Sequence, residues 1–164
     1  MRLKLELRNK QWVKRVLHKP SIKVVRAAAR FIKYTGHKLR VSYAHGRKFS
    51  GRCQGRFAFK IVPPGTWNPT DHLQAAINFF STACHELCHC QDNIDWNCFY
   101  DDYDKKRPEW RKRAEERAVF DRLYDLTDGT AEHYEHQFWV TQVKLPAYVQ
   151  NAILELAIAI EEAG

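Results

Sequence analysis

Apolar side chains recur every three to four residues in five stretches of the chain, and this spacing predicts five helices. The first approaches Pro20, where proline is expected to end it. The second starts with Ser21 as its capping residue and ends near Gly36. The third and longest follows the sequence Asn-Pro-Thr-Asp at 68–71, which combines a cap, a first-turn proline and an acid near the positive helix end, and runs to about Gln91.

The remaining two predicted helices lie in the second half of the chain. One begins at Pro108 and continues through Tyr124, and the last runs from Pro146 to Glu162, where its apolar stripe is expected to close the core. Residues 92–107, between the third helix and the fourth, are polar, aromatic and acidic, which is typical of a surface loop.

Two shorter stretches alternate between apolar and polar side chains, as half-buried strands do. They cover Leu39–His45 and Arg56–Val62, and a basic, glycine-containing connection from Gly46 to Gly55 separates them. We therefore expect either a β-hairpin or two adjacent strands. Together the elements predict an α+β fold, formed by one domain that covers residues 1–164.

Composition narrows the class of protein. With 45% apolar, 13% aromatic and 28% charged residues, the chain is neither disordered nor fibrous. No apolar run approaches the roughly 20 residues of a membrane-spanning helix, and the first six residues lack the continuous apolar segment of a secretory signal. The five cysteines are an odd number without the spacing of a secreted disulfide framework, so we expect a soluble, cytoplasmic protein.

The net charge of +8 conceals a strong asymmetry along the chain. Residues 1–60 contain 18 Lys and Arg against a single acid, Glu6, for a net +17, whereas residues 61–164 have a net −9. In one interpretation, residues 1–60 are a basic N-terminal layer that packs on an acidic remainder, so that the two screen each other. In the other, the basic residues bind nucleic acid or an acidic partner. The sequence leaves both open.

The third predicted helix contains the motif HExxH at positions 85–89. Two histidines four residues apart lie on one helix face, so the imidazoles of His85 and His89 can reach one Zn²⁺ ion at about 2.0–2.1 Å. Glu86 is rotated by roughly 100° from His85, where it can take a proton from a metal-activated water that attacks a peptide carbonyl. The motif therefore predicts a catalytic zinc site with Glu86 as its base.

A catalytic zinc site also requires a third protein ligand and an open fourth position. Asp95 is one candidate, because it stands where the longer motif HExxHxxGxxH has its third histidine, although Asp92 replaces the glycine of that motif. Another is Glu115, which Ala118 follows one helical turn later, a small residue that lets two helices approach. Its neighbour Glu116 is a third candidate.

The motif at 85–89, followed by Glu115-x-x-Ala118, resembles the gluzincin metallopeptidases, most closely the small cytosolic or phage-encoded minigluzincins and ImmA/IrrE-like proteins. The resemblance covers residues 55–122, the expected catalytic core of a zincin-like domain. It implies that His85, His89 and Glu115 bind zinc and that Glu86 acts as general base and acid. It also implies that the strand Phe57–Val62 is the sheet edge that aligns a peptide.

The chain departs from this family pattern at one position. Many gluzincins have Asp or Asn four residues after the ligand glutamate, where this chain has Val119, and so Glu116 and Asp95 stay open as alternatives to Glu115. A weaker likeness is to the SprT-like DNA-associated zinc proteases, which share HExxH and a basic character. Those proteins use a third histidine shortly after the motif, whereas the next histidine here is His133.

Several other residue types near the motif have two interpretations each. Cys84 and Cys88 either supply a thiolate to the metal or pack in the core. His133 and His136 either stabilise an oxyanion or lie on a polar surface. Aromatic side chains of the 92–107 loop either line or cover a cleft or simply pack; they are Trp96, Phe99, Tyr100 and Tyr103.

Three functions follow from these features. The first is a zinc-dependent endopeptidase that acts on a peptide or protein substrate. The second is a nucleic-acid-binding or DNA-associated protein that uses residues 1–60 on a zincin-like scaffold. The third is an interaction or toxin-like effector whose basic face docks an acidic partner. No membrane partner is expected for any of them.

Overall fold

A computed structural model of the chain describes residues 1–6, 15–44, 51–64, 71–96, 108–126 and 145–163. Within these residues it has an α+β fold, as the sequence predicts. The described helices are α1 (Arg15–Phe31), α2 (His72–Asp95), α3 (Glu109–Leu126) and α5 (Ala147–Ala163). The described strands are β1 (Arg2–Glu6), β2 (Lys38–Tyr43), β3 (Gly51–Cys53) and β4 (Ala58–Ile61).

The four strands form one mixed sheet in the order β1-β2-β4-β3. The expected neighbours β2 and β4 are adjacent, but they run parallel, so they do not form a hairpin with each other. The connection between them contains β3, which turns back through Gly55 (φ +98°) to pair antiparallel with β4. This extra strand makes β4 an internal strand and corrects the expectation that Phe57–Val62 forms the sheet edge.

Strand β1 was not among the predicted elements. It pairs parallel with β2 in the register Arg2↔Lys38 to Glu6↔Ser42, and it forms the edge of the sheet farthest from β3. Its sequence Arg-Leu-Lys-Leu-Glu alternates between polar and apolar residues, which is the period of a half-buried strand. The signal for this strand was therefore present in the sequence.

Helix α1 corrects two expected boundaries. It continues through Pro20 as one helix, and the hydroxyl of Ser21 donates a 2.5 Å hydrogen bond to the carbonyl of Leu17, one turn back, instead of capping a new helix. The helix ends before the expected Gly36, because Lys33 adopts a left-handed conformation (φ 59°). The amide of Tyr34 then bonds the carbonyl of Ala29, as in a Schellman ending.

Gly36 has a packing role instead. A Cβ atom on Gly36 would lie 2.1 Å from the hydroxyl oxygen of Tyr34, so only glycine leaves room for this side chain. The Tyr34 hydroxyl donates to the carbonyls of Lys38, at 3.0 Å, and Arg56, at 2.7 Å. It thereby ties the start of β2 to the residues just before β4.

The other helices follow the predicted pattern closely. Asp71 caps α2 by accepting a 2.9 Å hydrogen bond from the amide of Gln74, and the helix extends four residues beyond the expected Gln91. Helices α3 and α5 start directly after Pro108 and Pro146, as expected.

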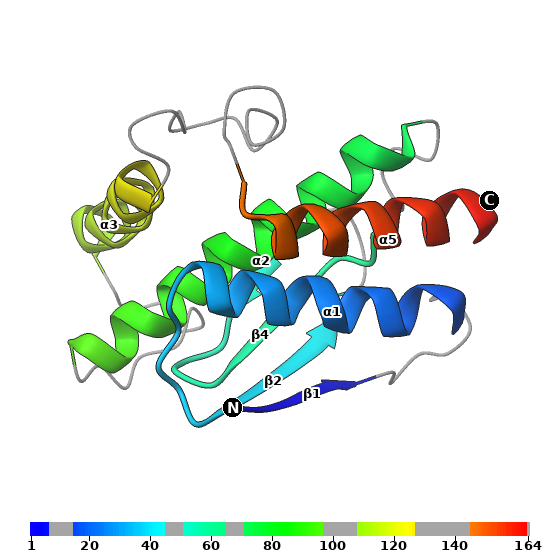
Figure 1. Cartoon of the computed structure of the whole chain (residues 1–164). Coiled ribbons are helices and arrows are strands. Elements are labelled where there is room, and N and C mark those ends of the chain that lie inside the picture. The colour runs from blue at the N-terminus through cyan, green and yellow to red at the C-terminus, as the bar shows by residue number, and fades with distance from the viewer. Residues whose placement is uncertain (7–14, 45–50, 65–70, 97–107, 127–144, 164) are drawn as a thin grey trace.

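The helices α1, α2 and α5 pack together on one side of the sheet, and α3 lies against α2 (Figure 1). Their contact surfaces form a single apolar core. Its largest fully buried side chains come from the four helices, from β2 and β4 and from the residue after α1. These include Val24, Val25, Ile32, Leu39, Val41, Phe59, Ile61, Ile77, Phe80, Leu87, Val119 and Leu156. None of the helices in the described part of the chain combines the length and the apolar character needed to cross a membrane.

Candidate metal centre

The side chains of His85 and His89 on α2 both meet the carboxylate of Glu116 on α3. The Nε2 atom of His85 lies 3.0 Å from Oε2 of Glu116, and the Nε2 atom of His89 lies 2.8 Å from Oε1. Among the residues that the structure describes, this is the one group of three His, Cys, Asp or Glu whose donor atoms all lie within 4.8 Å of one another. The two histidines of the motif thus converge with one carboxylate from a second helix.

The electrostatics of the group reflect this close contact. Burial by itself lowers the pKa of His89, but the hydrogen bond to Glu116 and the negative charges of Glu86 and Glu116 outweigh it and raise the pKa to about 9. Partial burial opposes ionisation of Glu116, yet the hydrogen bonds from both histidines hold its pKa well below the usual range. In the metal-free protein the group is therefore a charged, hydrogen-bonded cluster.

Glu115, the expected third member, does not join this group. Its carboxylate lies 3.5 Å from the guanidinium of Arg111, one turn earlier on α3, and Glu116 takes the place that was expected for it. Both glutamates precede the buried residues Val119 and Leu123 of this helix by about one and two turns, and Glu115 is the less exposed of the two, at 15% against 49%. The spacing of apolar residues on α3 therefore does not distinguish Glu116 from Glu115.

The residue four positions after Glu116 also contacts the group. Phe120 places its ring edge-on to the ring of His85, with centroids 5.6 Å apart. This contact restricts the imidazole by packing. Val119, the residue four positions after Glu115, is completely buried in the core.

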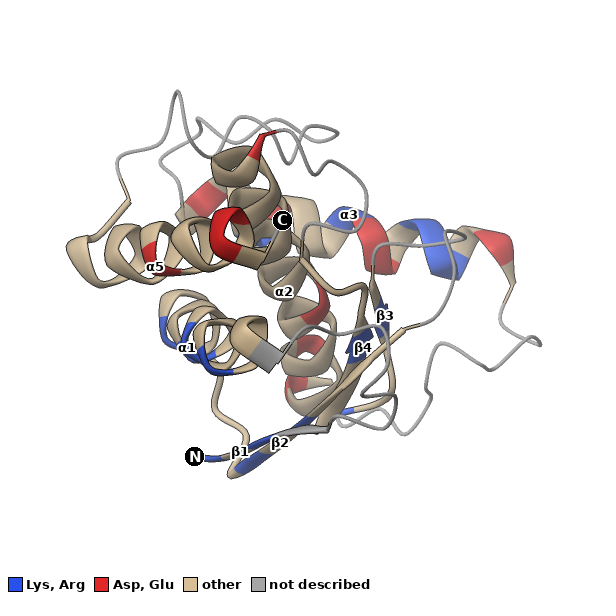
Figure 2. Ribbon diagram, turned by 90° about the vertical axis from the view of Figure 1, so that its right-hand side faces the viewer, with Lys and Arg blue, Asp and Glu red and all other residues tan. Residues whose placement is uncertain are grey.

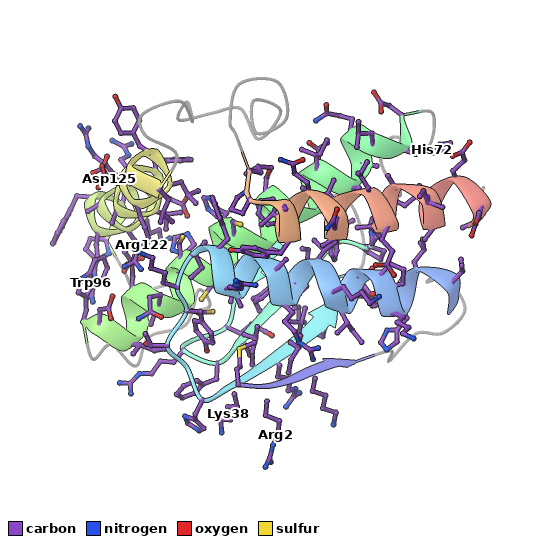
Figure 3. All side chains as sticks on the ribbon, in the orientation of Figure 1. Arg2, Lys38, His72, Trp96, Arg122 and Asp125 are labelled. Carbon is purple, nitrogen blue, oxygen red and sulfur yellow. The ribbon has the colours of Figure 1, made fainter. Side chains whose placement is uncertain are left out.

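A second set of charged contacts holds α3 against the C-terminal half of α2. The guanidinium Nη2 of Arg122 donates to Oδ1 of Asp92 at 2.6 Å and to Oδ2 of Asp95 at 3.2 Å. Figure 3 shows Arg122 between the two helices. These bonds lie about two turns from Glu116 along α3. They therefore help to fix the rotation of α3 about its axis and its position along α2.

Asp95, the other alternative to Glu115, belongs to this second set and not to the histidine group. Besides Arg122, its carboxylate accepts a 2.9 Å hydrogen bond from the side-chain amide of Gln91. The oxygen of the same amide accepts from the backbone of Thr35 at 2.7 Å. Asp95 therefore connects α2 to α3 and to the turn after α1.

Glu86 lies on the side of α2 that faces the sheet. It is 6% exposed, and strand β3 passes directly beside it. A Cβ atom on Gly51 would lie 2.9 Å from Cγ and 3.2 Å from Oε1 of Glu86, and 2.7 Å from Cγ2 of Thr82. Only a glycine lets β3 approach α2 this closely, and sequence reasoning did not identify Gly51 as part of the site.

The cysteines of the motif pack in the core. Cys84 and Cys88 are completely buried, and burial raises the pKa of both thiols, so neither favours the thiolate form. Cys53 and Cys90 lie with their sulfur atoms 3.7 Å apart. The prediction that Cys84 and Cys88 fill space agrees with this placement.

Some candidates lie outside the described residues. They are His133, His136, Cys98 and the loop aromatics Phe99, Tyr100 and Tyr103. Trp96, the first aromatic of that stretch, caps the C-terminus of α2, and its side chain is exposed.

The donor atoms of the group could hold a metal ion. Two imidazole nitrogens and one carboxylate form a ligand set found in catalytic zinc sites. The two imidazole nitrogens and the carboxylate oxygens all lie within 4.8 Å of one another, close enough for one metal ion to reach a donor atom of each residue. The side chain of Glu116 is 49% exposed, which leaves the group open on one side.

Comparisons with known proteins add no assignment. The chain has no significant match to a model of a protein family, to a curated protein or to a solved structure.

Proposed function

We propose that the protein is a zinc-dependent endopeptidase of the gluzincin type, with a zincin-like domain in which His85, His89 and Glu116 hold the metal. The observation that supports this most strongly is the meeting of both motif histidines with one carboxylate from a second helix, at 3.0 and 2.8 Å. Two residues four apart on a helix share a face by geometry alone, but a third donor from a distant helix requires the whole fold.

The roles in peptide hydrolysis follow from the chemistry of the motif. Zinc held by His85, His89 and Glu116 would polarise a peptide carbonyl and lower the pKa of a water to about 7. The carboxylate of Glu86 would accept the proton of the attacking water and deliver it to the leaving amine. The near-complete burial of Glu86 keeps bulk water away from this proton transfer.

Strand β3 is the part of the sheet that fits an extended substrate. Among the strands that the structure describes it is an edge strand, a position at which a peptide strand can be added. Gly51 brings this strand to within contact distance of Glu86. A peptide that adds to β3 would therefore run beside the proposed base Glu86. We accordingly assign to β3 the substrate-aligning role that the resemblance implied for Phe57–Val62.

Zinc content tests the ligand set. The wild type and the variants His85→Ala, Glu116→Ala and Glu115→Ala are purified in parallel, dialysed against ZnCl₂ and then buffer, and analysed for zinc per chain. We expect about one zinc in the wild type and in Glu115→Ala, and close to none in the other two. Glu115→Ala is a matched control, because it removes the neighbouring carboxylate on the same helix. A folded wild type without zinc, or loss of zinc in Glu115→Ala alone, would contradict the ligand set.

Hydrolysis tests the activity. The zinc-loaded wild type is incubated with a library of fluorescence-quenched peptides, and His89→Ala, prepared identically, is the control for contaminating proteases. Cleavage by the wild type alone supports the proposal. A wild type that binds one zinc and cleaves no peptide of the library would reject the peptidase activity and leave the metal centre in place.

A further inference from the structure

The face of the sheet that points away from the helices is strongly basic. Polar and apolar residues alternate along the strands, with Leu39, Val41, Phe59, Ile61 and Cys53 in the core. The positions between them face the other side, and six of these are cations, which we call the basic sheet face. They are Arg2, Lys4, Lys38, Arg40, Arg52 and Lys60.

The strand register brings these cations together in like-charged pairs. Arg2 is the partner of Lys38 and Lys4 of Arg40 across β1 and β2, and Arg52 is the partner of Lys60 across β3 and β4. Neighbouring strands lie about 4.8 Å apart, and like charges at directly opposite positions are destabilising. Glu6 is the single acidic residue within the four strands. The sheet thus concentrates positive charge at a cost in stability.

Four of the six cations of this face are exposed, and Arg52 and Lys60 are half-buried. The exposed ones are Arg2, Lys4, Lys38 and Arg40. Figure 3 shows Arg2 and Lys38 pointing away from the helical layer. Figure 2 shows basic residues on β1, β2 and β4 as well as on α1 and α3, while the acidic residues visible in it lie on the helices. The charge asymmetry of the sequence therefore becomes a basic surface on one side of the molecule.

Helix α1 carries the other row of exposed cations, and its surroundings differ. Lys23 forms a 2.8 Å ion pair with Glu155 of α5, and the guanidinium of Arg30 lies 3.9 Å from the ring centroid of Tyr148. These contacts attach α1 to α5. Lys23 and Arg30 thus take part in packing, as in the first of the two interpretations of the charge asymmetry.

We propose that the basic sheet face binds the phosphate backbone of double-stranded DNA. B-DNA presents one negative charge per roughly 1.7 Å of its axis, and a row of Lys and Arg that neutralises it needs no base contacts. Aromatic residues that stack on unpaired bases are absent from the outward positions of the four described strands, and Ser42 is the one hydroxyl there. This chemistry suits duplex phosphates, and it lacks the stacking platforms of single-strand and RNA readers.

The proposal does not depend on the metal centre. Lys38 lies 5.4 Å from the ring centroid of Phe57, and none of the six cations belongs to the histidine group. The two sites meet at β3, where Gly51 contacts Glu86 from one side and Arg52 belongs to the basic sheet face. Binding to DNA and binding of zinc can therefore be measured separately in the same protein.

The experiment measures binding of the full chain to a fluorescein-labelled 24-base-pair DNA of arbitrary sequence, by fluorescence anisotropy from 50 to 300 mM NaCl. The test variant is Arg2→Gln/Lys38→Gln. The control is Lys19→Gln/Arg26→Gln, which removes the same charge from exposed positions of α1. We expect the test variant to reduce the slope of log K against log salt by about two and the affinity at 100 mM NaCl about tenfold or more. The control should match the wild type within about twofold, and circular dichroism and zinc content verify the fold of each variant.

Three results would overturn the proposal. The first is a wild type that does not bind the duplex at 50 mM NaCl. The second is an equal loss of affinity in both double variants, since net charge alone would then explain it. The third is tighter binding of polyglutamate, single-stranded DNA or duplex RNA than of duplex DNA at matched charge, since the face would then have a different partner.

Discussion

Charged residues are arranged in opposite ways in two regions, the contact between α2 and α3 and the basic sheet face. At the helix contact, opposite charges meet at hydrogen-bonding distance, as Glu116 does with two histidines and Arg122 with two aspartates. On the sheet face, like charges stand opposite each other in register. The first arrangement pairs opposite charges, whereas the second sets like charges side by side, an arrangement that an anion in solution would stabilise. The contrast separates a site formed by internal partners from a surface suited to an external one.

The two regions also differ in how far their charged side chains are buried. Glu86, His89 and Asp92 are among the few buried polar residues of the described chain, and each lies on α2. The sheet-face cations Arg2, Lys4, Lys38 and Arg40 are exposed. Charges in a buried cluster interact strongly and resist salt, while those on an exposed face respond to ionic strength. Mutations at the two regions should therefore have different signatures.

The largest effect is expected for Glu86→Gln. The amide cannot accept the proton, so hydrolysis should fall by about 10²–10⁴-fold. The bound zinc should remain near one per chain, because the three ligands are unchanged. The measurement is the cleavage rate of the best library peptide together with zinc analysis of the same sample. Retention of full activity would reject Glu86 as the base.

The second-largest effect is expected from breaking the ion pairs of Arg122. Arg122→Ala leaves the buried carboxylate of Asp92 without its partner and should lower the free energy of unfolding by about 2–3 kcal/mol. It should also weaken zinc binding, because α3 carries Glu116. Urea unfolding and a competitive zinc titration measure the two effects. Arg113→Ala is the control, since its partner Glu109 lies 3.9 Å away on the surface, and it should change the unfolding free energy by less than about 0.5 kcal/mol.

The pH dependence of the metal-free protein tests the histidine group. His89 has a pKa of about 9 against an ordinary value of 6.5, so its contribution is complete below pH 6.5 and is lost as the pH rises through 9. Glu116 has a lowered pKa, so its contribution is complete above its ordinary value of 4.5 and is lost as the pH falls below that value. Stability from this group should therefore be highest between pH 4.5 and 6.5 and decrease by about 2 kcal/mol towards pH 9.5.

Urea denaturation at a series of pH values measures this profile in the presence of a chelator. Glu116→Gln should remove most of the dependence of the unfolding free energy on pH, while Glu115→Gln should leave this dependence unchanged. A wild-type profile that does not fall between pH 7 and 9.5 would show that His89 is not held in its charged form.

The smallest effect is expected on the sheet face. Arg2→Gln/Lys38→Gln relieves a like-charged pair and should raise the stability of the free protein by a few tenths of a kcal/mol at low salt. Lys23→Gln breaks the ion pair with Glu155 and should lower stability by a similar amount. Thermal unfolding at 20 and 300 mM NaCl measures the stability change of each variant relative to the wild type. Both changes should be smaller at 300 mM NaCl. A destabilising effect of both changes would remove the contrast between the two basic surfaces.

Local patterns account for the parts of the fold that were predicted correctly. The cap at Asp71, the prolines before α3 and α5 and the spacing of apolar residues depend on neighbours within a few positions. The same local rules failed at α1, where Pro20 and Ser21 looked like a break between two helices. Burial of Leu17, Val24 and Val25 on one continuous face holds the helix together through the proline.

The arrangement of strands was beyond local information. The alternation of residues 39–45 and 56–62 predicts strands but not their direction. The three-residue strand β3, which makes β4 internal, is too short to produce a period. Its position depends on Gly51 fitting against Thr82 and Glu86 of α2. That contact joins residues more than thirty positions apart.

The sequence by itself determined the α+β class, the helix that carries HExxH and the convergence of His85 and His89 on one face, because a helical period of 3.6 residues requires it. Only the tertiary structure decided that Glu116 and not Glu115 meets them. The two residues differ by about 100° of rotation, and the packing of α3 against α2 brings Glu116 to 3.0 and 2.8 Å from the histidines while Glu115 lies beside Arg111. It likewise decided that the basic residues of β1 and β2 lie side by side, since strand pairing is set by backbone hydrogen bonds between segments that are distant in the chain.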